Sequence, residues 1–381
     1  MDFTYDDEQD ALREAVRGLV GASYSDFEAR RRTVASDPGF DERLWGRLAE
    51  MGVLGLPFAE EHGGVGAGPV EVAIVAQELG RVLAPEPFLT SVVLAGGIVA
   101  AAGSDEQRTE VLGALASGEC VLAFAHAEPG ARWSPAASGV GASSGPDGWT
   151  LSGVKEPVPH GARADRLVVS AVLPSGGTGL FLVASNASGL TREGYPTHDG
   201  GRAARIGFDA TPAVPLGEEG RDQVDRIELV LDLARVAAAN QAIGAMEHAL
   251  SATTSYLTNR KQFGVTLNTF QALTFRAADM YVSLELATSL ATWAAMVAAS
   301  GTPEEVADAA ARASLQVSRS GRHIGQEAIQ LHGGIGMTAE FSIGSYTSHL
   351  TALDHLLGDG DHHLRVLAAG VGGYGEVDPL G

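Results

Sequence analysis

The sequence is poor in two residue types that carry specific chemistry. It contains a single cysteine, Cys120, and its only lysines are Lys155 and Lys261. One cysteine cannot close an intrachain disulfide, and it cannot supply a metal site built from several thiolates. This cysteine usage is typical of a reducing compartment, so we expect a cytoplasmic protein.

Positive charge is also scarce. The chain carries 26 basic and 47 acidic side chains, which gives a formal net charge of -21. That charge repels a phosphate backbone, and no stretch concentrates enough arginine to overcome the repulsion, so nucleic acid is not an expected partner. A small anionic ligand could still bind to a few local arginines or to a helix N-terminus.

Long apolar runs and targeting segments are absent as well. The most apolar stretch, residues 88–102, contains a Gly pair and is shorter than the roughly 20 residues that cross a bilayer. It is typical of a buried helix, so no membrane partner is expected. Residues 1–8 lack the basic and apolar regions of a signal peptide.

Several common site motifs are missing too. Gly139 and Gly141 are followed by a loop instead of the third glycine and the helix of a dinucleotide fold. The chain also lacks the Gly-x-Ser-x-Gly elbow of many hydrolases. His355, His362 and His363 crowd together, but no two have the i, i+4 spacing of helical metal ligands, and an aspartate capping the last helix explains the cluster. We expect no metal site.

The hydrophobic pattern changes twice along the chain. Residues 6–118 carry helical periodicity, with a Ser104–Gln107 capping box before the last helix of this region. Short apolar runs separated by Gly, Pro, Ser and Asp follow, as in strands, and helical spacing returns after Arg221. The sequence predicts an α+β fold with an N-terminal helical domain (1–118), a central antiparallel β domain (119–222) and a C-terminal helical bundle (223–381).

Two segments in the last region carry a specific pattern. Arg260-Lys261-Gln262-Phe263-Gly264 breaks a helix and precedes Phe270-Gln271, and Gln330-Leu331-His332-Gly333-Gly334 follows farther on. In the β region, Glu128-Pro129-Gly130 and Leu151-Ser152-Gly153-Val154-Lys155 precede them. In this order, the motifs resemble those of acyl-CoA dehydrogenases, and the resemblance covers almost the entire chain.

The resemblance implies a fold, a cofactor and a reaction. Members of this family combine an N-terminal helical domain, a central β domain and a C-terminal four-helix bundle, and they bind FAD across a subunit interface. A glutamate takes the α-proton of an acyl-CoA while the β-hydrogen leaves as hydride to the flavin. By the same resemblance, the Arg260 position pairs with the pyrophosphate of a neighbouring subunit's FAD. The implied cofactor-binding residues are Arg260, Lys261, Gln262, Phe263, Phe270, Gln271, Gln330, Leu331, His332, Gly333 and Gly334.

The sequence departs from the family where the chemistry takes place. The two positions at which members carry the catalytic glutamate correspond to Gly358 and Ala234, so the resemblance implies no catalytic residue in this chain. Asp359, one residue away, is the alternative base. In the β region, Ala127 and Pro159 stand where the family has threonines that contact the flavin.

These losses, with a bulky Trp133 beside the expected ligand channel, lie on the side that holds the isoalloxazine and the substrate. The motifs that serve a neighbour's FAD are intact.

The leading hypothesis is therefore a non-catalytic subunit of a heteromeric acyl-CoA dehydrogenase, as in α2β2 members that act on CoA esters of steroid side chains. Its partners would be a homologous glutamate-bearing subunit, an acyl-CoA and an electron-transfer flavoprotein or similar acceptor. Two alternatives stay open: a self-sufficient homotetramer with a displaced base, and a flavin-free scaffold or binding protein.

Overall fold

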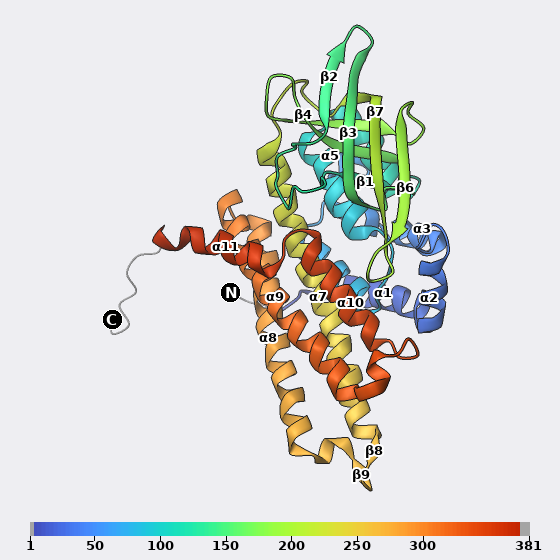
Figure 1. Cartoon of the computed structure of the whole chain (residues 1–381), viewed down its shortest axis with the longest axis vertical. Coiled ribbons are helices and arrows are strands. Elements are labelled where there is room, and N and C mark those ends of the chain that lie inside the picture. The colour runs from blue at the N-terminus through green and yellow to red at the C-terminus, as the bar shows by residue number, and fades with distance from the viewer. Residues whose placement is uncertain (1–3, 374–381) are drawn as a thin grey trace.

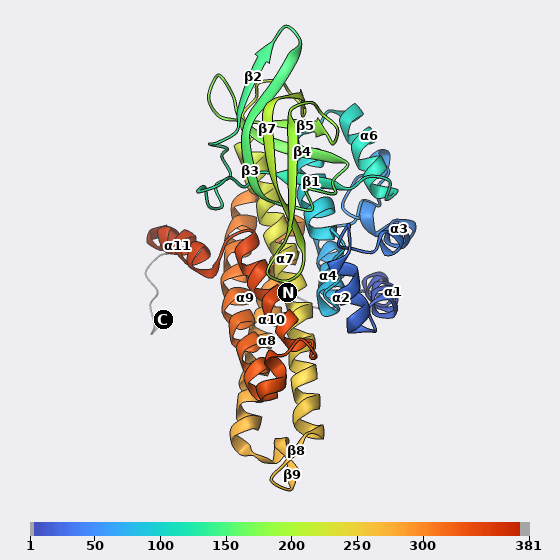
Figure 2. The same cartoon turned by 45° about the vertical axis from the view of Figure 1, so that its right-hand side comes forward.

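The computed structural model describes residues 4–373, and its three regions follow one another along the chain (Figure 1). Residues 1–3 and 374–381, at the ends of the two predicted helical domains, lie outside the described residues. Helices come first, then a β-sheet, then a second set of helices, so the predicted α+β fold class is confirmed. Figure 2 shows the sheet at one end of the molecule and the long helices extending away from it.

The N-terminal helices begin where the sequence provides a cap. Asp6, Asp26, Asp41 and Ser104 each accept a hydrogen bond from a backbone N–H in the first turn of the helix that follows. Ser104 and Gln107 form the predicted capping box. The helices are α1 (Asp7–Ser23), α2 (Phe27–Ala35), α3 (Glu42–Glu50), α4 (Pro69–Arg81), α5 (Gly97–Ala102) and α6 (Asp105–Ala116), with the 3-10 turns η1 (Val53–Gly55) and η2 (Glu60–His62).

The apolar stretch of residues 88–102 is a buried helix, as predicted, but most of it is not α-helical. Phe88–Gly96 forms the π-helix η3, which continues directly into α5. The hydroxyl of Ser91 in η3 accepts a hydrogen bond of 2.8 Å from the backbone N–H of Leu122 in the first strand. This bond ties the N-terminal helices to the sheet.

The central region is a seven-stranded sheet in the order β1-β4-β2-β3-β7-β5, with β6 beside β7. Most pairs are antiparallel, but β1 and β2 each pair parallel with β4. The sequence predicted an antiparallel β domain, and the sheet differs from that prediction at these two pairs. The long β2–β3 hairpin and its loops separate β1 from β4, which gives the chain room to return in the same direction. The strands are β1 (Leu122–Ala125), β2 (Gly141–Gly145), β3 (Gly148–Pro159), β4 (Arg166–Val172), β5 (Thr178–Ala184), β6 (Leu190–Pro196) and β7 (Arg202–Pro215).

The sheet is covered on both faces, and successive residues of β4 point to different cores. Val168 packs in the core shared with the N-terminal helices, whereas Leu167 and Val169 pack in the sheet's own core. This alternation follows from the two-residue period of a strand. Strand β4 therefore reads as a continuous apolar run.

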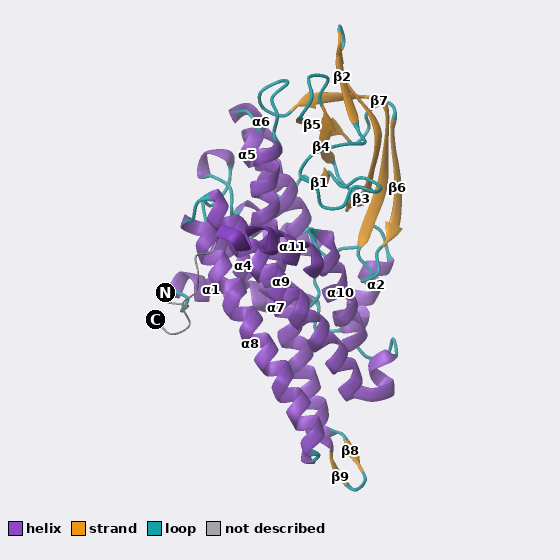
Figure 3. Ribbon diagram, turned by 60° about the vertical axis from the view of Figure 1, so that its left-hand side comes forward, coloured by secondary structure: helices purple, strands orange, loops and turns teal. Residues whose placement is uncertain are grey.

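The C-terminal helices form the bundle, which Figure 3 shows as a long helical layer below the sheet. Helices α4 and α7 approach closely at Gly80 and Gly244, where an added Cβ would lie 1.9 Å from the backbone oxygen of the facing helix. The elements are α7 (Val224–Asn259), β8 (Lys261–Gln262), β9 (Val265–Thr266), η4 (Leu267–Thr269), α8 (Gln271–Ser300), α9 (Pro303–His332), η5 (Gly333–Met337), α10 (Ile343–Leu356), α11 (Gly360–Gly370) and η6 (Val371–Gly373).

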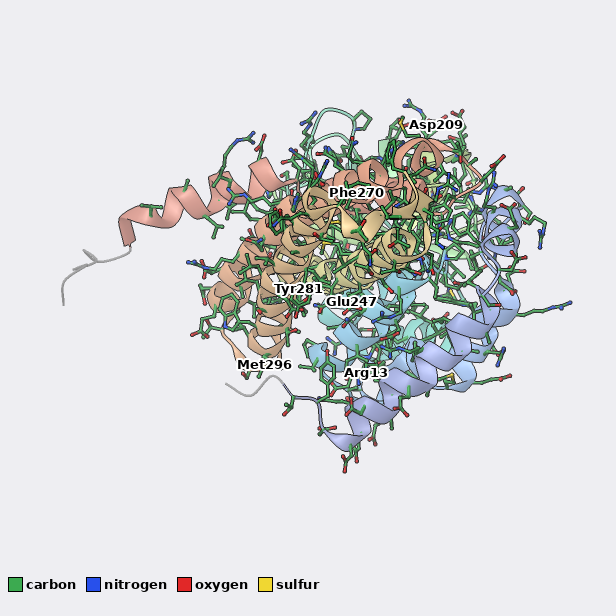
Figure 4. All side chains as sticks on the ribbon, turned by 90° about the horizontal axis from the view of Figure 1, so that it is seen from below. Arg13, Asp209, Glu247, Phe270, Tyr281 and Met296 are labelled. Atoms are coloured by element: carbon green, nitrogen blue, oxygen red, sulfur yellow. The ribbon has the colours of Figure 1, made fainter. Side chains whose placement is uncertain are left out.

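Helices α7 and α8 are long and apolar enough, by length and composition alone, to cross a membrane. Helix α7 is a core helix, because 78% of its most apolar 18-residue segment is buried in the structure. The corresponding segment of α8 is only 28% buried. The α8 side chains Phe275, Tyr281, Val282 and Leu286 are exposed. Tyr281 is labelled in Figure 4, which views the bundle from below. Within the described part of the chain, α8 presents an apolar surface that nothing covers.

Candidate functional site

The structure brings the two C-terminal motifs to the same end of the bundle. Arg260 follows the last residue of α7, and Gln330 lies in the last turn of α9. The rings of Tyr256 on α7 and His332 on α9 have centroids 4.5 Å apart, which fixes the two helix ends side by side. Residues far apart in the sequence therefore form one surface.

This surface, which we call the hairpin end, exposes most of the predicted cofactor-binding residues. The exposed ones are Arg260, Lys261, Gln262, Phe263, Gln271, Gln330, Gly333 and Gly334, and Phe270, labelled in Figure 4, is half-buried. Among the described residues, no acceptor lies within hydrogen-bonding distance of the Arg260 side chain. A free guanidinium beside exposed amides and two glycines is chemically suited to a diphosphate.

Two predicted cofactor-binding side chains face inward instead. Leu331 is part of the bundle core, and His332 lies between Tyr256 and Phe341. His332 Nδ1 is 2.7 Å from the Ala328 carbonyl oxygen. A ligand at the hairpin end could meet these two residues only through their backbone, because their side chains hold the end of α9 against α7.

The other half of the predicted site is a cavity of about 110 Å³ between the sheet and the end of α10. The structure places Ala127, Pro157, Pro159 and Trp133 together in its wall, as the motifs imply. Three of these side chains carry no hydrogen-bond donor, and the Trp133 N–H is already used. The position of the missing threonines is thus lined by carbon.

A buried ion pair supports the cavity wall. Lys155 Nζ is 2.5 Å from Glu128 Oε1 and 3.0 Å from both the His126 carbonyl and the Ser170 hydroxyl. Burial would raise the pKa of Glu128, but Lys155 and Ser138 lower this pKa to about 2. Burial has the opposite effect on the two bases: it lowers the pKa of Lys155 to about 8 and the pKa of His126 to about 4. The glutamate in the family motif is therefore an ionised structural group, not a proton acceptor.

Gly358 shows why no catalytic glutamate fits at the first predicted position. Its φ is +129°, and an added Cβ would lie 2.7 Å from His362 Cδ2 and 2.7 Å from His363 Nε2. Burial lowers the pKa of His363 to about 3, so this imidazole is neutral. Ala234, the second predicted position, is fully buried in the core of α7. Neither position offers a proton acceptor or the space to add one.

Asp359, the alternative base, is a helix cap. Its carboxylate accepts a hydrogen bond of 2.8 Å from the backbone N–H of His362 at the start of α11. This contact fixes the direction of the side chain along the helix axis. The arrangement accounts for Asp359 without any role in proton transfer.

Trp133 closes the cavity on the same side. Its indole N–H donates to the His355 carbonyl oxygen at 3.1 Å, and its ring lies 5.4 Å from that of His362. His126 Nε2, 2.7 Å from the Ser134 carbonyl, fixes the loop that carries Trp133. The loop is thereby joined to the turn between α10 and α11.

The structure contains a second and larger cavity that the sequence did not indicate. It measures about 320 Å³ and shares Pro157, Pro159, His355 and Leu356 with the first. It contains a buried contact between His349 Nδ1 and Asp199 Oδ2 at 2.9 Å. These two residues lie in α10 and in the β6–β7 connection, so no local motif could have revealed them.

Comparison with known proteins decides the family. A model of the acyl-CoA dehydrogenase N-terminal domain matches residues 6–119, and a model of its C-terminal domain matches residues 224–372. The acyl-CoA dehydrogenase IpdE2 of Mycobacterium tuberculosis is 33% identical over 348 residues, which cover 90% of this chain and 91% of that protein. This chain belongs to the acyl-CoA dehydrogenase family. Its members are oxidoreductases that act on CH–CH bonds, and the cofactor is FAD.

Two solved structures show the same acyl-CoA dehydrogenase fold at similar identity. One is a variant of the Tcur3481-Tcur3483 steroid ACAD; it is 33% identical, with a TM-score of 0.86 over 96% of this chain and 98% of that one. The other is the ChsE4-ChsE5 complex of Mycobacterium tuberculosis. It is 27% identical, with a TM-score of 0.88 over 99% of this chain and 100% of that one.

The two halves of this acyl-CoA dehydrogenase chain fit FAD unequally. The hairpin end fits a dinucleotide tail, because Arg260 has no protein acceptor among the described residues and an added Cβ at Gly333 or Gly334 would meet nothing within 4 Å. The cavity end lacks the side-chain donors that the family directs at the ring. When bound, FAD supplies the acceptor for two electrons and a proton. Arg260, Gln271 and Gln330 are the side chains here that would hold it.

Proposed function

We propose that this chain is the non-catalytic subunit of a heteromeric acyl-CoA dehydrogenase and that its hairpin end completes the FAD site of a glutamate-bearing partner. The observation that carries the proposal is Gly358, where two histidines fill the space that a catalytic side chain would need. The Arg260 guanidinium, left without a partner in the described part of the chain, supports the FAD-holding role.

The exposed apolar face of α8 supports a partner chain. Phe275, Tyr281, Val282 and Leu286 form a run along one helix that a soluble chain rarely leaves in water. Phe263 and Met337, at the hairpin end, are more exposed still, at 90% and 82%. A homologous subunit on this face would bury these side chains and place its FAD tail against Arg260.

The proposed reaction is α,β-dehydrogenation of an acyl-CoA, and the proposed substrate is the CoA ester of a steroid side chain. The similarity to the steroid ACAD structure, at 33% identity, supports this substrate class. A further similar structure, 27% identical and named as the electron transferring flavoprotein of Acidaminococcus fermentans, supports reoxidation by such a protein. In the glutamate-bearing subunit, the base takes the α-proton. In this chain, Arg260 binds phosphate, and neither Gly358 nor Ala234 can accept a proton.

The test compares FAD content and turnover of the chain alone, a glutamate-bearing homologue alone, and the two co-purified. We expect full flavin occupancy and dehydrogenation only in the mixed complex. In that complex, Arg260→Ala should weaken FAD binding by about 10- to 100-fold, the value of one charge-assisted hydrogen bond to phosphate. Arg43→Ala, an exposed arginine on α3, is the matched control and should leave binding unchanged.

Full FAD occupancy and turnover by the chain alone would reject the proposal. So would a mixed complex in which the flavin content does not depend on Arg260. A homotetramer that uses Asp359 is tested in the same preparation, because Asp359→Asn would abolish flavin reduction only if that carboxylate were the base.

A further inference from the structure

The second cavity combines apolar walls with a polar inner end. Leu89, Ala352, Leu353 and Leu356 line it with carbon, and it measures about 320 Å³. The inner end is built by α2, the segment before η3, the β6–β7 connection and α10. A ligand with an apolar body and one polar group would match this division.

Arg30 supplies hydrogen-bond donors without a protein partner at that end. Its side chain is 5% exposed, and its Nε donates to the Leu83 carbonyl oxygen at 2.5 Å. No acceptor among the described residues lies within hydrogen-bonding distance of its two terminal nitrogens. Arg202 Nε, in the same cavity wall, is buried without a partner. Buried guanidinium donors of this kind require an anion or ordered water.

The nearby Asp199 makes no hydrogen bond to Arg30, because its carboxylate is turned toward other partners. Oδ1 accepts from the Thr197 hydroxyl at 2.6 Å and from the Gly201 N–H at 3.2 Å, and Oδ2 is 2.9 Å from His349 Nδ1. Burial would raise the pKa of Asp199, but His349 and Thr197 hold it well below its usual range. Asp199 is thus an ionised acceptor held by these contacts, and its charge is the largest effect that opposes the lowering of the Arg30 pKa by burial.

Glu86 provides the second group that faces the cavity. Its Oε1 accepts from the Tyr24 hydroxyl at 2.5 Å and from the Asp41 N–H at 3.2 Å, whereas its buried Oε2 has no partner. Burial raises the pKa of Glu86 to about 7, so below neutral pH the group is an uncharged acid with a hydrogen to donate. The terminal nitrogens of Arg30 then remain as donors that no described acceptor uses.

We propose that this cavity binds the carboxylate group of an otherwise apolar ligand, with Arg30 and Glu86 as the groups that recognise it. The carboxylate accepts from the terminal nitrogens of Arg30, and the ligand's carbon chain lies against Leu89 and Leu356. The site lies beyond the FAD-holding role of the hairpin end. Two sources offer the same chemistry: a free carboxylic acid, or an acyl-CoA whose far end carries a carboxylate and reaches through the shared wall at Pro157 and Pro159.

The test is calorimetric titration of the full chain with two matched pairs of probes. Octanoate is compared with octanamide, which has the same chain without the charge, and suberyl-CoA is compared with octanoyl-CoA, which lacks the terminal carboxylate. We expect the carboxylate member of at least one pair to bind about 10-fold or more tightly, and Arg30→Met to remove that preference. Arg43→Met, on the exposed face of α3, should change neither pair.

The two arms identify the source. A preference for octanoate that depends on Arg30 indicates a free acid, and one confined to suberyl-CoA indicates the far end of an acyl-CoA. Equal binding within both pairs, or a preference that survives Arg30→Met, overturns the proposal. If Arg30→Met does not fold, Ala352→Phe fills the cavity from α10 and leaves Arg30 itself in place, and it must abolish the preference. Flavin content is measured in parallel, so the FAD-holding role can fail without affecting this result.

Discussion

Gly358→Ala provides the sharpest test of how this chain lost its catalytic position. The change adds one methyl group at a residue with φ +129°, and that methyl lies 2.7 Å from atoms of both His362 and His363. The unfavourable backbone conformation costs about 1–3 kcal/mol for a non-glycine residue. Forcing two packed imidazoles apart adds about 1–3 kcal/mol. We expect the free energy of unfolding to fall by about 2–6 kcal/mol, the sum of these two costs.

Urea unfolding followed by circular dichroism measures this loss, and Gly148→Ala is the matched control. Gly148 also has a positive φ, of +106°, but an added Cβ there meets nothing within 4 Å. The control therefore carries the conformational cost alone, and the difference between the two variants isolates the contact with the histidines. A Gly358→Ala variant no less stable than Gly148→Ala would refute the steric argument.

The same contact has a functional consequence. Gly358→Glu should not create a working dehydrogenase by itself, because its side chain would have to displace His362 and His363 before it reached a substrate. Combining Gly358→Ala with His363→Ala removes one of the two contacts and should recover part of the lost stability. Independent, additive effects of the two changes would mean that the residues do not touch.

Two further predictions concern buried charges. Lys155→Met should reduce the free energy of unfolding by about 3–5 kcal/mol, because it leaves the Glu128 carboxylate buried without its cation. The control Lys261→Met, in the exposed hairpin, should change the free energy of unfolding by less than about 0.5 kcal/mol. Similar melting temperatures for both variants would contradict the role of the ion pair. Burial raises the pKa of Glu86, which lies beside Tyr24 and Asp41, from 4.5 to about 7. The folded state therefore binds this proton more tightly than the unfolded state does. The stability that the proton contributes is complete below pH 4.5 and is lost as the pH rises through 7. The free energy of unfolding of Glu86→Gln, relative to that of the unchanged chain, should therefore rise by about 3 kcal/mol between about pH 4.5 and 8. A stability difference that is independent of pH would argue against the raised pKa.

The sequence by itself determined the fold class, because hydrophobic periodicity and caps are local. Ser104 begins its helix as predicted, and the aspartate cap expected for the last helix is Asp359. Asp6 and Asp41 cap their helices by the same local contact. Motif order likewise indicated the family, the flavin and the absence of glutamate at 358. These features depend on residues close together in the chain, or on a pattern that many relatives share.

Only the tertiary structure decided what the substituted positions mean. That His362 and His363 fill the space beside Gly358 depends on how the turn at Gly358 leads into α11, which packs against α9. That Leu331 and His332 face inward depends on how α9 meets α7. The parallel pairing of β1 with β4 and the second cavity, with Arg30 and Glu86 brought together from different elements, are contacts between segments distant in the sequence. Such contacts are set by packing and burial, which leave no local pattern to read.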